Sequence, residues 1–103
     1  MINRYSIKWL VTAKRDIAQL QNYIDENFKS PQISVNILTN IQIRMNILKV
    51  FPYSCPKVND TNLQEFRKLV IDNYIAFYKV NDIKRQVVIH RVIYAAREYG
   101  KLL

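Results

Sequence analysis

Apolar and polar positions alternate near both ends of the chain, whereas the apolar positions in its first half recur every three to four residues. Residues 4–11 alternate, which predicts a first strand. One face of this strand would carry Tyr5, Ile7, Trp9 and Val11. Thr12 can then cap a helix. The apolar positions of this helix follow spacings of three and four, which gives one stripe: Ile17, Leu20, Ile24 and Phe28.

A second helix is predicted to begin after residue 28. Ser30 is a suitable N-cap and Pro31 suits the first helical position, while Pro52 ends the helix after Phe51. This helix has two apolar rows, Leu38-Ile41-Met45-Leu48 and Ile43-Ile47-Val50. A helix that is apolar around so much of its circumference is expected to pack on two partners, the first helix and a sheet.

The last part of the chain predicts three further strands, after a loop that extends to about residue 62. The strands are residues 66–71, 74–80 and 86–94. Asp72-Asn73 and Asn81-Asp82 are suited to tight hairpin turns between them. We therefore expect an α+β fold of order β-α-α-β-β-β, in which a helical hairpin covers one face of a four-stranded antiparallel sheet that ends in a three-stranded meander. The 103 residues form one domain, 1–103, with a basic C-terminal tail at 95–103.

Charge narrows the choice of partners. The chain has 16 Lys and Arg against 8 Asp and Glu, for a net charge of +8. This favours an anionic partner, either nucleic acid or an acidic protein, although a solvated basic surface is the simpler alternative. Lys8 and Lys14-Arg15 interrupt the N-terminal apolar run, and no stretch approaches the roughly 18–20 apolar residues of a membrane span. We expect a cytoplasmic protein with no membrane contact.

The side chains available for chemistry exclude most enzyme classes. A single His and a single Cys give no metal-ligand spacing, no disulfide and no sign of a cofactor. His90 reads as a packed strand residue and Cys55 as a loop residue without a catalytic role. Metal-free RNA cleavage can still be built from Arg, Lys and Tyr, because Arg neutralises a phosphate while another group moves the proton. The candidates are Arg67, Arg91, Arg97 and Tyr99, and the alternative is that they are solvated charges or ion-pair partners.

Most of the aromatic residues occupy positions that suit a core. Tyr94 and Tyr99 are the exceptions, because they fall near the end of the last strand beside basic residues, where a base could stack.

Three segments in order carry a family resemblance: Phe66-Arg67-x-Leu69, Tyr74-Ile75-x-Phe77-Tyr78 and Arg91-Val92-Ile93-Tyr94-x-x-Arg97-Glu98. From Tyr5 to about Tyr99 the chain resembles the RelE/ParE family of toxins from bacterial type II toxin–antitoxin modules. The resemblance implies a small basic toxin that is neutralised by an antitoxin, whose acidic C-terminal segment wraps around it in a hetero-oligomer.

The resemblance also implies a choice between two targets. The ribonuclease branch of the family usually has an Arg where this chain has Ile75, whereas the branch that poisons DNA gyrase commonly has an aliphatic residue there. Tyr94 departs from the His that is usual in the gyrase branch. The leading hypothesis is therefore a gyrase poison, closer to ParE, without chemistry of its own. Its expected target-binding residues are Arg67, Arg91, Tyr94, Arg97 and Tyr99.

The alternative is a ribosome-dependent mRNA endonuclease (mRNA interferase) that needs no metal. In it, Arg67 or Arg97 would clamp the phosphate and Tyr99 would act as acid or base. A third hypothesis is a decayed toxin that keeps only its antitoxin binding. Antitoxin contact is expected on apolar surface left open on the helices or at the sheet edge, together with the basic tail.

Overall fold

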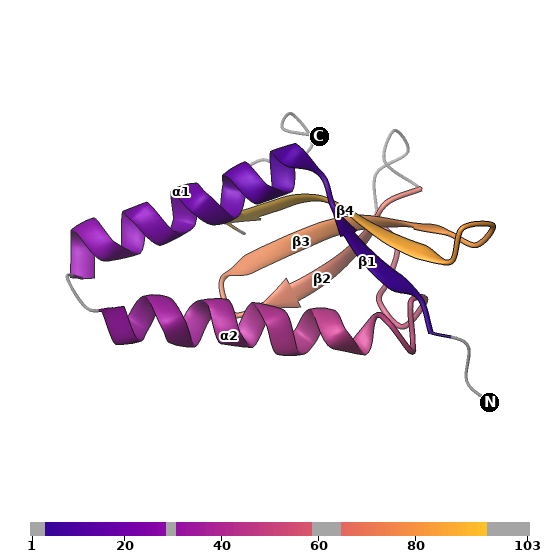
Figure 1. The fold of residues 1–103 in the computed structure, drawn as a ribbon, viewed down its shortest axis with the longest axis horizontal. Coiled ribbons are helices and arrows are strands. Elements are labelled where there is room, and N and C mark those ends of the chain that lie inside the picture. The colour runs from indigo at the N-terminus through magenta and orange to yellow at the C-terminus, as the bar shows by residue number, and fades with distance from the viewer. Residues whose placement is uncertain (1–3, 29–30, 59–64, 95–103) are drawn as a thin grey trace.

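Two helices cover one face of a four-stranded sheet in the computed structural model (Figure 1), which describes residues 4–28, 31–58 and 65–94. The elements are β1 (Ser6–Trp9), α1 (Val11–Phe28), α2 (Pro31–Ile47), β2 (Arg67–Ile71), β3 (Tyr74–Asn81) and β4 (Gln86–Tyr94). The predicted α+β fold and its element order are confirmed. The side chains of Phe28 and Ser30 and the tail 95–103, about which the sequence made predictions, lie outside the description.

The sheet has the order β1-β4-β3-β2. Strands β2, β3 and β4 form the predicted antiparallel meander, but β1 lies parallel to β4, with Ser6 opposite Gln86 and Trp9 opposite Ile89. The expectation of a fully antiparallel sheet was therefore wrong. Alternation along a strand is the same in either direction, so it carries no information on the orientation of a strand that pairs with a distant one.

The main core lies between the helices and the sheet. The predicted stripe of α1 supplies Leu20 and Ile24, and the first apolar row of α2 supplies Ile41, Met45 and Leu48, all buried. The sheet adds Leu69, Ile71, Ala76, Tyr78, Val87, Ile89 and Val92.

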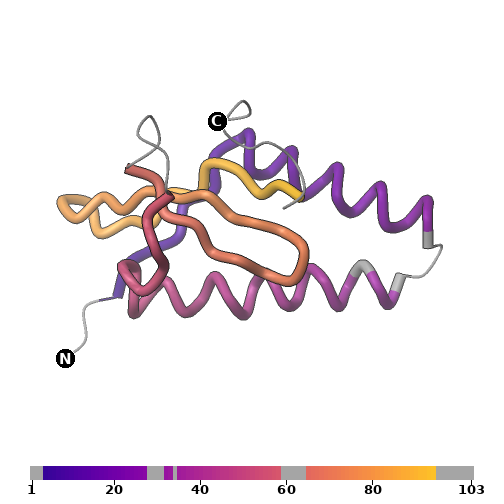
Figure 2. The backbone as a smooth tube through the Cα atoms, turned by 180° about the vertical axis from the view of Figure 1, so that it is seen from behind, coloured from indigo at the N-terminus to yellow at the C-terminus, as the bar shows by residue number. Residues whose placement is uncertain are grey.

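The second apolar row of α2 does not pack as expected. Ile43 and Ile47 are 57% and 45% exposed, so within the described chain α2 uses only one face. Both views show α2 along one border of the fold, with no other element on its outer side (Figures 1 and 2).

The ends of the elements differ from the sequence prediction in several places. Helix α2 ends at Ile47 and not at Phe51, because the N–H groups of residues 48–50 bond to carbonyls three residues back, which tightens the chain into a turn. Helix α1 begins at Val11, because the Leu10 carbonyl accepts the first helical bond from Lys14 N at 3.0 Å, and Thr12 Oγ1 instead donates to the His90 carbonyl at 2.7 Å. The first hairpin is tight, as predicted, and Asp72 adopts a positive φ of 52°. The second hairpin closes over four residues, since Asn81 pairs with Gln86, and it is not the short Asn81-Asp82 turn that we expected.

Candidate functional site

The sheet carries a second, smaller apolar cluster on the face away from the helices, which we call the open face. Buried Val58, Ile75, Phe77 and Ile93 form this cluster, and Phe66 packs against it. Ile75 is the position from which the resemblance led us to expect a gyrase poison. Its side chain is only 7% exposed and it pairs across the sheet with Ile93. The position is therefore part of the packing of the open face.

Arg67 begins β2, and its guanidinium contacts the loop that follows α2. Its Nη1 donates to the Cys55 carbonyl at 2.7 Å, and its guanidinium carbon lies 4.9 Å from the centre of the Tyr53 ring. Tyr78, opposite Arg67 on β3, donates from its hydroxyl to the Pro52 carbonyl at 2.9 Å, and burial raises the pKa of this hydroxyl. Arg67 and Tyr78 thus hold the loop against the end of the sheet.

Arg91 is paired with an acidic side chain of α1. Its Nε and Nη2 donate to the two carboxylate oxygens of Asp16, at 2.7 and 3.0 Å, in the fork geometry that arginine favours. The backbone N–H of Val92 donates to the same carboxylate at 2.9 Å. The hydrogen bond to Asp16 raises the pKa of Arg91. This ion pair fastens α1 to β4, which matches the salt-bridge alternative for Arg91.

Tyr94, at the end of β4, is 47% exposed. Its ring contacts Tyr74 edge-on, with 5.9 Å between the ring centres. Burial raises the pKa of Tyr74, and the nearby hydroxyls of Tyr23 and Tyr94 add to this effect. Tyr23 is 58% exposed, so three tyrosines meet at this end of the sheet and two of them face solvent.

Among the described site residues, Arg67 and Tyr94 are not brought together. Arg67 pairs with Tyr78 and Tyr94 pairs with Tyr74, so they stand four residues apart along β3, or about 13 Å at the usual rise of a strand. Arg97 and Tyr99 lie in the part of the chain that the structure does not describe, so their placement at the site stays a prediction.

Two contacts on the open face were missed by sequence reasoning. His90 lies edge-on to Phe66 at 4.9 Å between ring centres, and Lys79 Nζ lies 4.6 Å from the centre of the same ring. Lys79 also pairs with Glu65 at 3.3 Å. Burial, and to a smaller extent the charge of Lys79, lowers the pKa of His90, which favours its neutral imidazole. Alternation with Val87 and Ile89 places His90 on the open face, but it does not predict the contact with Phe66, which lies in another part of the chain.

Asp16 was also missed, although the sequence contains a signal for it. It lies three residues after Ala13 and four before Leu20, on the buried side of α1, and its side chain is 9% exposed. A carboxylate on an apolar stripe predicts a buried cationic partner.

A third unpredicted group ties the β3–β4 hairpin to its surroundings. The Asp82 carboxylate accepts hydrogen bonds from the hydroxyls of Tyr5 and Tyr53. The bond to Asp82 raises the pKa of Tyr53 to about 12 and that of Tyr5 above its ordinary value, and the same two bonds lower the pKa of Asp82. This cluster joins the start of β1 and the 51–58 loop to the hairpin.

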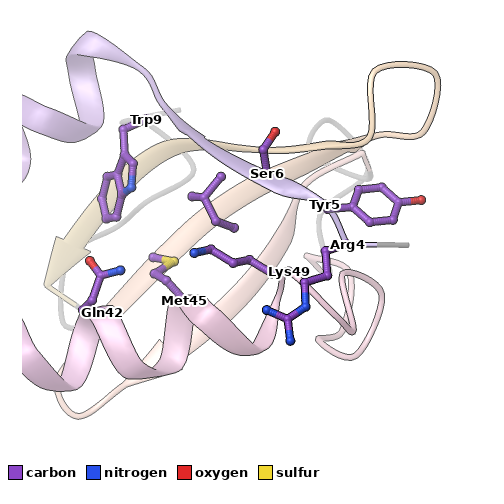
Figure 3. Close-up of a pocket in the computed structure, with 8 residues that line it drawn as sticks. Arg4, Tyr5, Ser6, Trp9, Gln42, Met45 and Lys49 are labelled. Carbon is purple, nitrogen blue, oxygen red and sulfur yellow. The ribbon is translucent and has the colours of Figure 1, made fainter. Parts of the chain in front are cut away.

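A groove of about 510 Å³ runs between the edge strand β1 and α2 (Figure 3). Figure 3 shows the side chains of Trp9, Met45 and Lys49 in the space between the two elements, with Arg4 at one end. A second groove of about 300 Å³ shares Trp9 and Gln42 with the first and continues between the helices. It is lined by Trp9, Lys14, Ile17, Leu38, Ile41 and Gln42. The charged groups that line the two grooves, Arg4, Lys14 and Lys49, are all basic.

Within residues 4–28, 31–58 and 65–94, no three metal-binding side chains gather into a group. Among the described helices, none combines the length with the hydropathy that crossing a bilayer requires.

Comparisons with known proteins agree with this architecture. Two solved structures have a similar fold. One is the RelBE2 toxin–antitoxin complex of Mycobacterium tuberculosis, with a TM-score of 0.64 and 22% identity over 88% of this chain and 98% of that one. The other is the chromosomal ParDE system of P. aeruginosa, with a TM-score of 0.72 and 16% identity over 89% and 97%. No curated protein sequence matches the chain.

The family comparison rests on the sequence itself. The ParE toxin of the type II toxin–antitoxin system parDE matches residues 7–99, which include every described strand and helix except the first residue of β1. The chain therefore belongs to the ParE toxin family of type II toxin–antitoxin systems.

Proposed function

We propose that this toxin inhibits growth in the cytoplasm by binding and poisoning DNA gyrase, and that a cognate antitoxin neutralises it. The observation that carries the proposal is the burial of Ile75 among Val58, Phe77 and Ile93 on the open face. An aliphatic side chain packed in this way supplies neither charge nor proton to a phosphate.

The contacts of the two described arginines among the candidates support the same proposal. Arg67 contacts loop carbonyls and Arg91 contacts Asp16, so both help to hold the fold together. Of the candidates, Tyr94 is exposed at the end of β4. The chain continues from there to Arg97 and Tyr99, and we assign target binding to Tyr94 and these two residues.

The test is incubation of the purified chain with gyrase, ATP and supercoiled plasmid, followed by detergent and protease treatment. We expect linear DNA from the parent chain and from the control Arg15→Ala, which changes an exposed residue of α1. We expect no linear DNA from Arg97→Ala or from a chain truncated after Tyr94. The truncated chain should keep its circular dichroism spectrum. Equal linear product from the truncated chain would refute the assignment to this segment, and no product from the parent chain would refute gyrase poisoning.

The alternative function is ribosome-dependent cleavage of mRNA, and the contacts of His90 favour it. Its neutral imidazole can accept the proton of a 2′-hydroxyl, and Lys79 beside it can neutralise a phosphate. In a translating extract, this function predicts cut mRNA with the parent chain and at least a hundredfold less with His90→Gln, the usual loss on removal of a general base. Intact mRNA with the parent chain would exclude it.

We assign antitoxin binding to the two grooves beside β1. They combine apolar walls with basic residues, which suits the acidic, amphipathic C-terminal segment expected of an antitoxin. The probe is the cognate antitoxin, titrated by calorimetry. Lys49→Glu should weaken binding about tenfold, or about 1.4 kcal/mol, whereas Lys68→Glu on β2 should not. Equal effects of the two changes on the affinity would refute the assignment of antitoxin binding to the grooves.

A further inference from the structure

Helix α2 has an outer face that differs from the rest of this basic chain. At 3.6 residues per turn, seven positions between residue 35 and the end of the helix point away from the core and are exposed. We call them the outer α2 face: Val35, Asn36, Thr39, Asn40, Ile43, Asn46 and Ile47. Three of the seven are aliphatic, and Val35, Ile43 and Ile47 are 54%, 57% and 45% exposed. The other four are neutral amides and a hydroxyl.

The charge of this face is as distinctive as its apolar content. Arg44 is the single charged residue in the 17 residues of α2, whereas α1 carries Lys14, Arg15, Asp16, Asp25 and Glu26. The outer α2 face itself contains no charge. At its borders lie Arg44 and the carboxylate of Asp72, to which Asn40 donates at 3.3 Å, so the charges beside it have opposite signs.

We propose that the outer α2 face binds a second copy of this chain. Two copies with a net charge of +8 repel each other, and contact is least costly where no charge is brought together. An acidic partner would gain from the Lys and Arg side chains of the grooves and would gain nothing here. The neutral amides of Asn36, Asn40 and Asn46 both donate and accept, so each can pair with the same residues of a copy.

The geometry suits two antiparallel helices related by a two-fold axis. The helix is about 25 Å long at 1.5 Å per residue, and the middle of its outer face lies near Thr39 and Ile43. One helix pair buries less than the roughly 1,600 Å² of a standard interface, so the dimer is weak and depends on concentration. Added salt should strengthen it, because salt screens the repulsion between the copies.

The first test is sedimentation velocity over a series of concentrations at low and high salt. We expect a monomer–dimer equilibrium that shifts toward dimer as salt rises. Ile43→Glu should weaken it at least tenfold, because two carboxylates would face each other. The matched control is Val70→Glu, which changes an aliphatic residue that is 50% exposed on β2 and should leave the equilibrium unchanged. Circular dichroism checks that both variants are folded.

A second test detects the pairing directly. In a Cys55→Ser background, Ile43→Cys should form a disulfide between two copies under mild oxidation, and Val70→Cys should form much less. A monomer at every concentration and salt level would overturn the proposal. A dimer that Ile43→Glu leaves intact, or equal cross-linking at positions 43 and 70, would also overturn it. The same holds if the chain is monomeric and its outer α2 face becomes protected only when the antitoxin binds.

Discussion

Replacement of Asp16 by alanine tests the view that Arg91 is primarily a structural residue. The change removes the acceptor of three hydrogen bonds, from Arg91 Nε, Arg91 Nη2 and Val92 N. It leaves a guanidinium that is only 23% exposed without its carboxylate. In a fully buried pair, loss of one partner costs about 3–5 kcal/mol. Solvent reaches part of Arg91, so we expect a loss of about 2–3 kcal/mol in the free energy of unfolding.

The assay is equilibrium unfolding in urea at pH 7, with the midpoint and slope fitted for each variant. In a domain of this size, the expected loss corresponds to a fall in Tm of roughly 10–20 °C. The matched control is Asp25→Ala, an exposed carboxylate on the same helix, which should change the free energy of unfolding by less than about 0.5 kcal/mol. A loss for Asp16→Ala no larger than that of the control would refute the argument.

A double-mutant cycle separates the pair from its surroundings. Asp16→Leu combined with Arg91→Met should recover part of the stability that either change loses alone, because apolar side chains of similar size remove both desolvated charges. If the recovered double variant also poisons its target, Arg91 contributes to folding and is not a target-binding residue. Additive losses would show that the two side chains do not act as a pair.

Three further outcomes follow from the contacts described above. Ile75→Arg places a charge in the cluster of the open face, so it should lower the free energy of unfolding by about 3 kcal/mol and create no RNA cleavage; Ile75→Leu is its control. Tyr53 has a pKa of about 12 when folded against an ordinary value of 10.0, so its bond to Asp82 stabilises the fold below pH 10 and is lost between pH 10 and 12. In Tyr53→Phe, the free energy of unfolding should not show this fall between pH 10 and 12. The same dependence on pH as in the parent chain would contradict the prediction. The pKa of His90 is lowered in the folded chain, so the unfolded chain binds the proton more readily and the free energy of unfolding falls as the pH drops below 6.5. His90→Gln should make the free energy of unfolding depend less on pH in this range. Urea midpoints compared at several pH values measure this dependence.

The elements of the fold could be predicted from local pattern. The meander, the tight turn at Asp72-Asn73 and the core stripe of α1 follow from residue spacing, because each depends on neighbours within a few positions. Residue spacing also identified both apolar rows of α2. It did not reveal that one row is exposed, because a periodic pattern shows which residues share a face but not whether a partner covers it.

The candidate site depended on tertiary structure. Basic residues at 67 and 91 looked alike in the sequence, as cations free to meet a phosphate. Each of them binds a group from another part of the chain: Asp16 lies 75 residues from Arg91, and the Cys55 carbonyl lies 12 residues from Arg67. The parallel pairing of β1 has the same cause, because the direction of a strand is set by the path of the chain through both helices. The sequence by itself determined the family, the order of elements and the charge. Only the tertiary structure decided which charged side chains hold the fold together, because an ion pair forms between whichever groups the fold brings within a few ångströms.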